Sequence, residues 1–240
     1  MRRLLYIILG IVLLTACQQD ELPTKGQGSA VLELDLMRAG RPTMTTRAVD
    51  ADLAVAIYKQ GGIPYVQYAA GSVPKKIVLE PGIFKVVAYS ENQDTWQTAN
   101  GGKGAACYYA ETSVEMENDM VVRLALEVPM TNYAVGLELP EHFTELFRSY
   151  TFTLRSGSRT TAIQQGEKAY FDVADGGFSY ALRATNTDGK TNSHSAIDFP
   201  DVEAGKLFTL RYSYDSDATS GGVDIVITDD METDDTNVTL

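Results

Sequence analysis

The sequence predicts an all-β protein built from two tandem antiparallel β-sandwich domains. Its apolar stretches are short, rich in β-branched and aromatic residues, and alternate with polar residues with a period of two. Turn residues such as Gly61-Gly62, Pro81-Gly82 and Gly101-Gly102 separate these stretches. Short alternating strands with turn signals roughly every 8–12 residues are typical of a β-sandwich.

Five strands are predicted in the first half of the chain. They cover residues 30–36, 53–58, 65–68, 76–79 and 83–89. The first one alternates cleanly, because Glu33 and Asp35 separate Leu32, Leu34 and Leu36. Successive side chains of a strand point to opposite faces, so this pattern indicates a strand with one buried face.

A partial internal repeat divides the chain into two halves. Residues 114–124 align with residues 202–212, and residues 80–86 align with residues 174–180. Each half therefore has a glycine turn, a strand, and a late strand that carries an arginine. We predict an N-terminal sandwich over residues 30–127 and a C-terminal sandwich with an acidic tail over residues 128–240. One short helix is expected in a connection, at residues 141–147.

Residues 1–16 have the pattern of a secretory signal peptide. Two arginines precede an apolar run that is shorter than the roughly 20 residues needed to span a bilayer. The run ends in Leu14-Thr15-Ala16-Cys17, the pattern of a bacterial lipoprotein signal, in which the cysteine thiol receives a diacylglycerol and the peptide is cut before it. We therefore predict lipidation of Cys17, and two or three acyl chains hold a protein on a membrane durably.

Residues 17–29 are polar and contain proline and glycine, which is the composition of a tether. The acidic pair Asp20-Glu21 resembles the export signal that sends some Bacteroidetes lipoproteins to the outer face of the outer membrane. This resemblance favours exposure on the cell surface, although an ordinary solvated tether explains the same residues.

Composition excludes several classes of partner and chemistry. The net charge of −12 should repel nucleic acid and anionic membrane surfaces. The two histidines have no metal-ligand spacing, and nucleotide and hydrolase motifs are absent. We therefore predict no catalytic residues, no metal and no cofactor, and we do not expect an enzyme. With Cys17 lipidated, Cys107 is the one free thiol, and its role stays open.

The predicted loop over residues 90–106 is long and polar and holds the single tryptophan, Trp96. Tyr108 and Tyr109 follow just beyond it. Aromatic side chains on a sandwich loop can stack on sugars, so these three residues are candidates for glycan contact. The alternative is that Trp96 folds back and caps the core, as large aromatic side chains usually do.

These features together resemble a Bacteroidetes lipoprotein family of unknown function that shares features with the fimbrillin-like surface proteins. The resemblance rests on Cys17, Thr46-Arg47-Ala48, residues 53–58, Gly61-Gly62, residues 74–79 and residues 81–89, and it covers most of residues 14–240. It implies two tandem sandwiches of the fimbrillin or transthyretin type, exported as a lipid-anchored precursor.

The resemblance also implies assembly by strand exchange. An arginine-specific protease cuts in the N-terminal region and releases the first strand, and a strand of another subunit fills the groove that is left. On this sequence the cut falls after Arg47, with Arg38 and Arg41 as alternatives, and residues 30–36 form the removed strand. Arg47 is otherwise an ordinary loop arginine. An uncut form keeps its lipid and serves as an anchor or tip component.

We therefore expect a lipid-anchored structural or adhesive subunit of a fimbria, located at the outer membrane and exposed on the cell surface. Its partners would be other fimbrial subunits or further copies of itself. The alternative is a surface glycan-binding lipoprotein of a polysaccharide-uptake system, which would contact host or dietary glycan through Trp96, Tyr108 and Tyr109.

Overall fold

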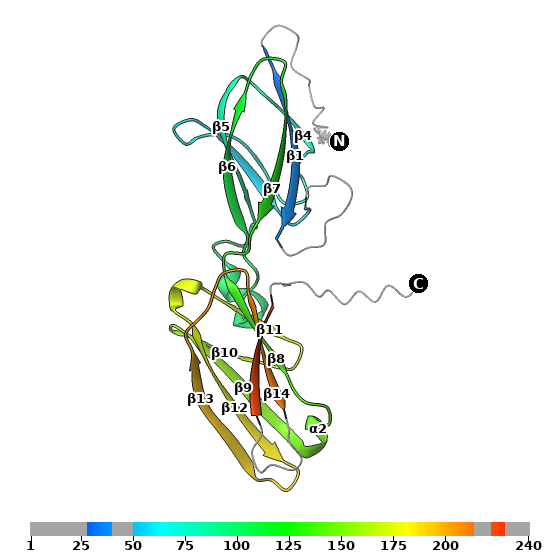
Figure 1. Ribbon diagram of the computed structural model, residues 1–240, viewed down its shortest axis with the longest axis vertical. Helices are drawn as coiled ribbons and strands as arrows, with labels where there is room; N and C mark the ends of the chain where they lie inside the picture. The colour runs from blue at the N-terminus through cyan, green and yellow to red at the C-terminus, as the bar shows by residue number, and fades with distance from the viewer. Residues whose placement is uncertain (1–27, 40–49, 214–221, 229–240) are drawn as a thin grey trace, which may run out of the picture.

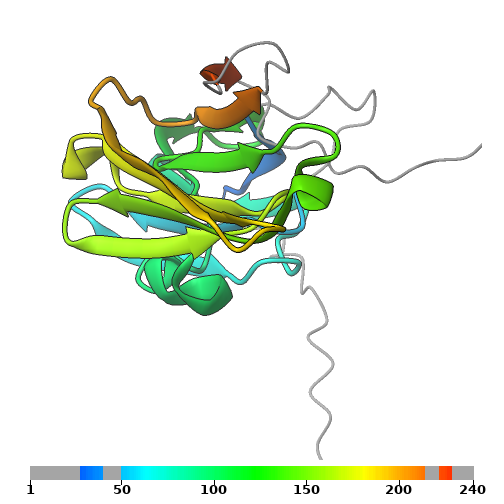
Figure 2. The same cartoon turned by 90° about the horizontal axis from the view of Figure 1, so that it is seen from below.

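A computed structural model of the chain describes residues 28–39, 50–213 and 222–228. Cys17, Arg41 and Arg47 lie outside these residues. Most of the described chain is β-strand, and the strands form four sheets. The sheets make two sandwiches that are stacked end to end in an elongated molecule, and Figure 2 shows the nearer sandwich end on as two facing layers (Figures 1 and 2). The predicted all-β fold with two sandwiches is confirmed.

The first sandwich pairs a three-stranded sheet with a four-stranded one. The three-stranded sheet has the order β4 (Lys76–Leu79), β1 (Ala30–Arg38), β7 (Val121–Val128). The four-stranded sheet has the order β3 (Ile63–Tyr68), β2 (Ala54–Lys59), β5 (Gly82–Tyr89), β6 (Tyr109–Met116). All five strands predicted for the first half of the chain are present.

The second sandwich has two four-stranded sheets. One has the order β11 (Lys168–Phe171), β8 (Tyr133–Glu138), β14 (Leu207–Ser213), β15 (Gly222–Thr228). The other has the order β10 (Arg159–Ile163), β9 (Phe147–Ser156), β12 (Phe178–Asn186), β13 (Thr191–Phe199). A single turn of helix, α2 (Phe143–Leu146), connects β8 to β9, where the sequence predicts a short helix.

The two sandwiches share one topology. In the first, β1 is antiparallel to β4 and parallel to β7, and in the second β8 is antiparallel to β11 and parallel to β14. The arginines of the predicted repeat are equivalent: Arg123 pairs with Glu33 across β7 and β1, and Arg211 pairs with Glu138 across β14 and β8. The partial sequence repeat therefore reflects a structural repeat, to which the second sandwich adds β15.

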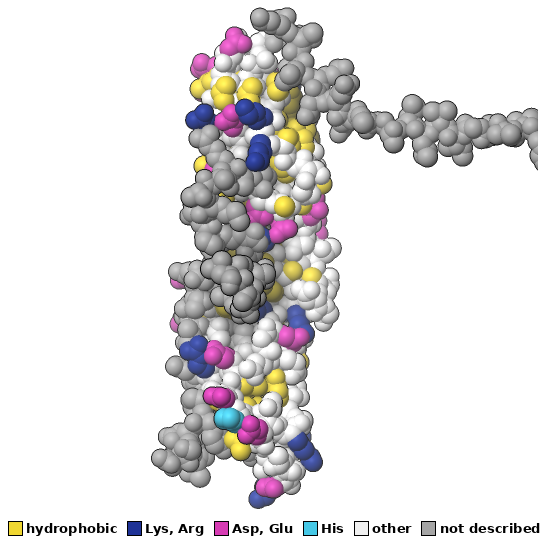
Figure 3. Space-filling model, turned by 90° about the vertical axis from the view of Figure 1, so that its right-hand side faces the viewer, with side chains coloured by type: hydrophobic (Ala, Val, Ile, Leu, Met, Phe, Trp, Pro, Cys, Tyr) yellow, Lys and Arg dark blue, Asp and Glu magenta, His cyan; other side chains and the backbone are white. Residues whose placement is uncertain are grey.

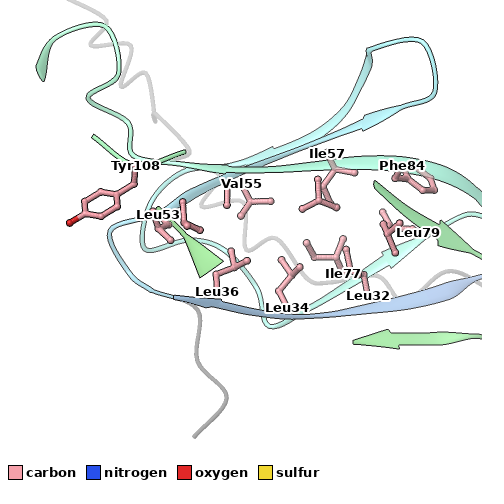
Figure 4. Close-up of a cluster of buried hydrophobic side chains, with 14 of the residues drawn as sticks. Leu32, Leu34, Leu36, Leu53, Val55, Ile57, Ile77, Leu79, Phe84 and Tyr108 are labelled. Atoms are coloured by element: carbon pink, nitrogen blue, oxygen red, sulfur yellow. The ribbon is translucent and has the colours of Figure 1, made fainter. Parts of the chain in front are cut away.

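Each sandwich has its own core. The side chains labelled in Figure 4 belong to the first core: Leu32, Leu34, Leu36, Leu53, Val55, Ile57, Ile77, Leu79, Phe84 and Tyr108. Val128 and Met130 are buried in this core as well, so the first sandwich extends past the predicted limit at residue 127. The second core is centred on Tyr133, whose ring packs against those of Phe171 and Phe208.

Candidate functional site

Strand β1 fills the slot between β4 and β7. Residues 31–38 pair in parallel with β7, and residues 30–33 pair in antiparallel with β4. On the inward face Ala30, Leu32, Leu34 and Leu36 are at most 4% exposed. The predicted alternation is therefore confirmed, and β1 is the central strand of its sheet rather than an edge strand.

The connection after β1 crosses to the opposite sheet. β1 forms no pairs with β2, the strand that follows it, because β2 belongs to the opposite sheet. The chain leaves β1 after Arg38 and next enters the described structure at Asp50, whose N–H donates to the carbonyl oxygen of Leu36 at 3.0 Å. The chain thus returns to the end of the strand it has just left, and residues 40–49 form the covalent link between β1 and the rest of the sandwich.

Arg38 anchors the end of β1. Its Nε donates to Asp50 Oδ2 at 2.9 Å, and its Nη2 donates to Asp52 Oδ2 at 2.7 Å. Its guanidinium also lies over the ring of Tyr108, 5.2 Å from the centroid. The Arg38 side chain is only 10% exposed. Of the three arginines considered for cleavage, Arg38 is the one seen to be enclosed, whereas Arg41 and Arg47 lie outside the described residues.

The solvent side of the sheet is crossed by ion pairs. Glu33 on β1 contacts Lys76 on β4 at 3.1 Å and Arg123 on β7 at 3.0 Å, and the hydrogen bonds from Lys76 and Arg123 lower the pKa of Glu33. Basic and acidic side chains are interspersed along this side of the molecule (Figure 3). Exposed ion pairs contribute little to stability, so β1 is held mainly by its buried leucines and its main-chain hydrogen bonds.

Trp96 lies in a short 3₁₀ turn, η1 (Trp96–Thr98), and is only 8% exposed. The guanidinium of Arg159, from β10 of the second sandwich, lies 5.5 Å from the centre of its ring. Arg159 also donates to three main-chain carbonyl oxygens: Tyr170 at 2.9 Å, Gly102 at 2.9 Å and Gln97 at 3.1 Å. The burial of Trp96 agrees with the packing alternative, and the residue lies where the two sandwiches meet.

Further contacts tie the same loop to the second sandwich. Lys103 forms an ion pair with Glu167, and its carbonyl oxygen accepts from the N–H of Tyr170 at 2.7 Å. Gly104 has a φ of +85°, and a Cβ there would lie 3.0 Å from the carbonyl oxygen of Tyr170. We name residues 96–104 together with Arg159 the interdomain clamp. Sequence reasoning missed Arg159, because no local pattern marks a contact across 57 residues or more.

The three aromatic residues predicted for glycan contact do not share one surface. Tyr108 is buried beneath Arg38, and Trp96 is buried in the interdomain clamp. Tyr109 is 36% exposed, and its hydroxyl donates to Glu111. Of the three, Tyr109 is therefore the one whose side chain is open to solvent.

The remaining reactive side chains form no further centre in the described part of the chain. Cys107 is a buried free thiol beside Ser90. Within residues 28–39, 50–213 and 222–228, no group of three or more metal-ligating side chains comes together. The same ranges contain no helix that is long and apolar enough to cross a membrane.

Comparison with known families gives one match that covers most of the chain. The family described as a domain of unknown function (DUF4493) matches residues 28–240. No curated protein matches the chain in sequence.

Several solved structures are similar in fold. A candidate cell adhesion protein from Bacteroides uniformis is 14% identical, with 87% of this chain and 100% of that chain covered and a TM-score of 0.50. A candidate cell adhesion protein from Bacteroides eggerthii is 12% identical, with 84% and 95% covered and a TM-score of 0.49. The C-terminally truncated tip fimbrial protein Mfa3 from Porphyromonas gingivalis is 10% identical, with 83% and 98% covered and a TM-score of 0.45. At such low identity, the likeness to the Bacteroides uniformis protein establishes a shared fold.

Proposed function

This chain belongs to the DUF4493 family, and we propose that it is a lipid-anchored, fimbria-like subunit of the cell surface that assembles by exchange of its first strand. The proposal follows the fimbrillin resemblance of the sequence. The fold shared with a candidate cell adhesion protein supports it, because a sheet that loses a strand exposes an edge to which another strand can pair.

The observation that carries the proposal is the position of β1. It is the central strand of its sheet, it comes first in the described chain, and residues 40–49 join it to the rest of the sandwich. A cut within that segment would leave β1 attached through lateral contacts alone. If β1 then left, β4 and β7 would each present an unpaired edge, which is a template for a strand from another chain.

Burial makes spontaneous loss of β1 unfavourable. Leu32, Leu34 and Leu36 are almost fully buried, and each would lose roughly 1.5–3 kcal/mol of burial on leaving. Release should therefore need both proteolysis and a competing strand. This requirement suits a subunit that must stay folded until it meets its neighbour.

Cleavage after Arg47 would separate the lipid from the sandwich domains, because Cys17 lies on the N-terminal side of that bond. The released piece would carry the lipid, the tether and β1 together. A cut subunit is then held at the surface by its neighbours, whereas an uncut subunit is held by its own acyl chains. The same chain can thereby act as a shaft component or as an anchor, depending on processing.

The proposal is tested by expressing the full-length chain in a Bacteroides host that is fed a clickable fatty acid. The uncut wild-type precursor should carry the label, and the detergent-resistant ladders built from cut subunits should lack it. Cys17→Ala should carry no label in any form. Arg47→Ala should keep the label and lose the ladders. Arg41→Ala, which changes a neighbouring arginine, serves as the matched control. Equal labelling of the uncut precursors of Cys17→Ala and wild type would refute the anchor, and undiminished ladders in Arg47→Ala would refute cleavage at that residue.

A further inference from the structure

The outward face of the four-stranded sheet of the first sandwich carries a pocket of about 330 Å³. Its lining comes from β2, β5 and β6, the loops beside them and the turn before β3. The lining residues are Tyr58, Gly62, Lys85, Val87, Tyr89, Gln93 and Tyr109. We name this feature the tyrosine pocket. It lies on the opposite sheet from β1, so it does not depend on the strand-exchange proposal (Figure 1).

Strand alternation brings the three tyrosines together. Ile57, Phe84 and Ala88 point into the first core, so the intervening positions on β2 and β5 point outward. Tyr89 lies opposite Tyr109 in the pairing of β5 and β6.

The middle of this face is formed by small or branched side chains. Val87 lies opposite Ala56 in the pairing of β5 and β2, and both residues are buried although they lie on the outward face. Tyr58, Tyr89 and Tyr109 are larger and at least partly exposed. The pocket therefore has an aliphatic floor and aromatic walls.

Polar groups in and beside the pocket are fixed by one another. Glu111 accepts from the hydroxyl of Tyr109 and from Lys85 Nζ, the latter at 3.1 Å. Both contacts lower the pKa of Glu111, and the hydrogen bond to its carboxylate raises the pKa of Tyr109 to about 12. On the other side of the pocket, the amide of Gln67 donates to the hydroxyl of Tyr89. The positive charge of Lys85 is balanced by Glu111, so the pocket has polar groups but no net charge.

The structural repeat shows that the fold does not require these tyrosines. Phe84 of β5 corresponds to Phe178 of β12 in the predicted repeat. Tyr58, Tyr89 and Tyr109 then correspond to Arg155, Arg183 and Ser193, as the matching strand pairs confirm. The second sandwich is built on the same topology with no aromatic side chain at any of the three positions. The aromatic walls are thus a property of the first sandwich alone, and a ligand would account for them.

We propose that the tyrosine pocket binds an uncharged sugar unit of a glycan. A pyranose ring has an apolar C–H face that packs against aromatic rings, while its hydroxyls need donors and acceptors at the edge of the site. The tyrosine walls supply the first kind of contact. Lys85, Gln93 and the Tyr109–Glu111 pair supply the second. Glu111 neutralises Lys85, the charged residue of the lining, so the pocket offers no unpaired positive charge to a sialylated or sulfated sugar and suits a neutral one better.

The test uses the purified full-length chain on an array of defined neutral and acidic oligosaccharides, followed by titration calorimetry with the best neutral hit. We expect Tyr58→Ala and Tyr109→Ala each to bind that hit about tenfold more weakly. Tyr65→Ala should bind like wild type. Tyr65 is the matched control, because it lies in the same sheet outside the tyrosine pocket and is 39% exposed, close to the 36% of Tyr109.

NMR of the wild-type protein gives a second measurement that does not depend on the variants folding. On addition of the neutral hit, the amide signals of β5 and β6 next to the tyrosine pocket should shift, and those of the second sandwich should stay. The proposal would be overturned if the protein bound no neutral glycan on the array. Equal affinity of Tyr109→Ala and Tyr65→Ala would do the same, as would shifts confined to another surface.

Discussion

Brief trypsin treatment of the folded full-length chain, followed by addition of a synthetic β1 peptide, tests how β1 is held. We expect the first cut at Arg41 or Arg47. Arg38 should resist, because its side chain is enclosed by Asp50, Asp52 and Tyr108. The fragment that contains β1 should remain bound after the cut, and it should leave only when a peptide of residues 28–39 is supplied.

The burial of β1 in the structure gives the free energy that holds the cut fragment in place. Leu32, Leu34 and Leu36 are each at least 96% buried, and at roughly 1.5–3 kcal/mol each they favour the bound strand by about 4.5–9 kcal/mol. Since about 1.4 kcal/mol corresponds to a factor of ten, burial alone favours the bound state by a factor of about 10³ to 10⁶. Main-chain hydrogen bonds to β4 and β7 add to this preference. Spontaneous loss of the fragment should therefore be negligible.

Fluorescence anisotropy of a labelled peptide of residues 28–39 measures the exchange, and size-exclusion chromatography detects the displaced fragment. The control peptide interchanges Leu32 with Glu33 and Leu34 with Asp35, which keeps composition and charge. This change moves two leucines to the solvent side, so the control should not compete.

Two results would contradict this reasoning. Equal incorporation of native and control peptides would mean that the groove does not select the leucine face. Dissociation of the fragment directly after the cut, without any peptide, would mean that β1 is held far more weakly than its burial implies.

The boundary between the sandwiches, the interdomain clamp and the tyrosine pocket lead to further predictions. Residues 28–131 expressed alone should give a β-rich circular-dichroism spectrum and a cooperative melt, because all of the first core except Ala134, Leu207 and the flanking Tyr170 lies within them; a cooperative melt of the full chain only would contradict this. Arg159→Ala should lower the unfolding free energy by about 2 kcal/mol and shift the fluorescence of Trp96 to the red, since three hydrogen bonds and the cover over its ring are lost; unchanged emission would argue against the clamp. Glu111→Gln should lower the pKa of Tyr109 from about 12, as measured by ¹³C NMR of labelled tyrosine. The folded pKa lies above the unfolded value near 10, so the stability that Tyr109 adds is complete below pH 10 and is lost as the pH rises toward 12.

Local patterns in the sequence were sufficient to predict the strands and the internal repeat. The alternation of Leu32, Leu34 and Leu36 predicts a strand with one buried face, because the period of a strand does not depend on its neighbours. The partners of that strand could not be predicted. β7 lies about 90 residues further along the chain, and its parallel register is fixed by packing of the whole sandwich.

For the aromatic residues, too, contacts between segments distant in the sequence could not be predicted. The loop around Trp96 is long and polar as predicted, but it also contains η1 and a second short helix, α1 (Ala99–Gly102), which the sequence did not predict. The burial of Trp96 depends on Arg159, which no nearby pattern indicates. Alternation was sufficient to place Tyr58 and Tyr89 on an outward face. That Tyr109 lies beside Tyr58 and Tyr89 could be known only from the order of β2, β5 and β6 in the sheet. Lipidation at Cys17 stays a prediction from sequence.

The interdomain clamp has a consequence for how the protein tolerates sequence change. Arg159 donates to carbonyl oxygens of Gln97, Gly102 and Tyr170, and every amino acid supplies such an oxygen. The side chain of Gln97 is therefore free to vary without loss of its hydrogen bond, whereas Gly102 has a φ of +86°, which other residues rarely adopt. The hydrogen bonds depend on Arg159 itself. A lysine in its place could not keep them, because it lacks the planar guanidinium that reaches several acceptors at once. The contact between the two sandwiches thus depends on one arginine and hardly at all on which side chain stands at residue 97.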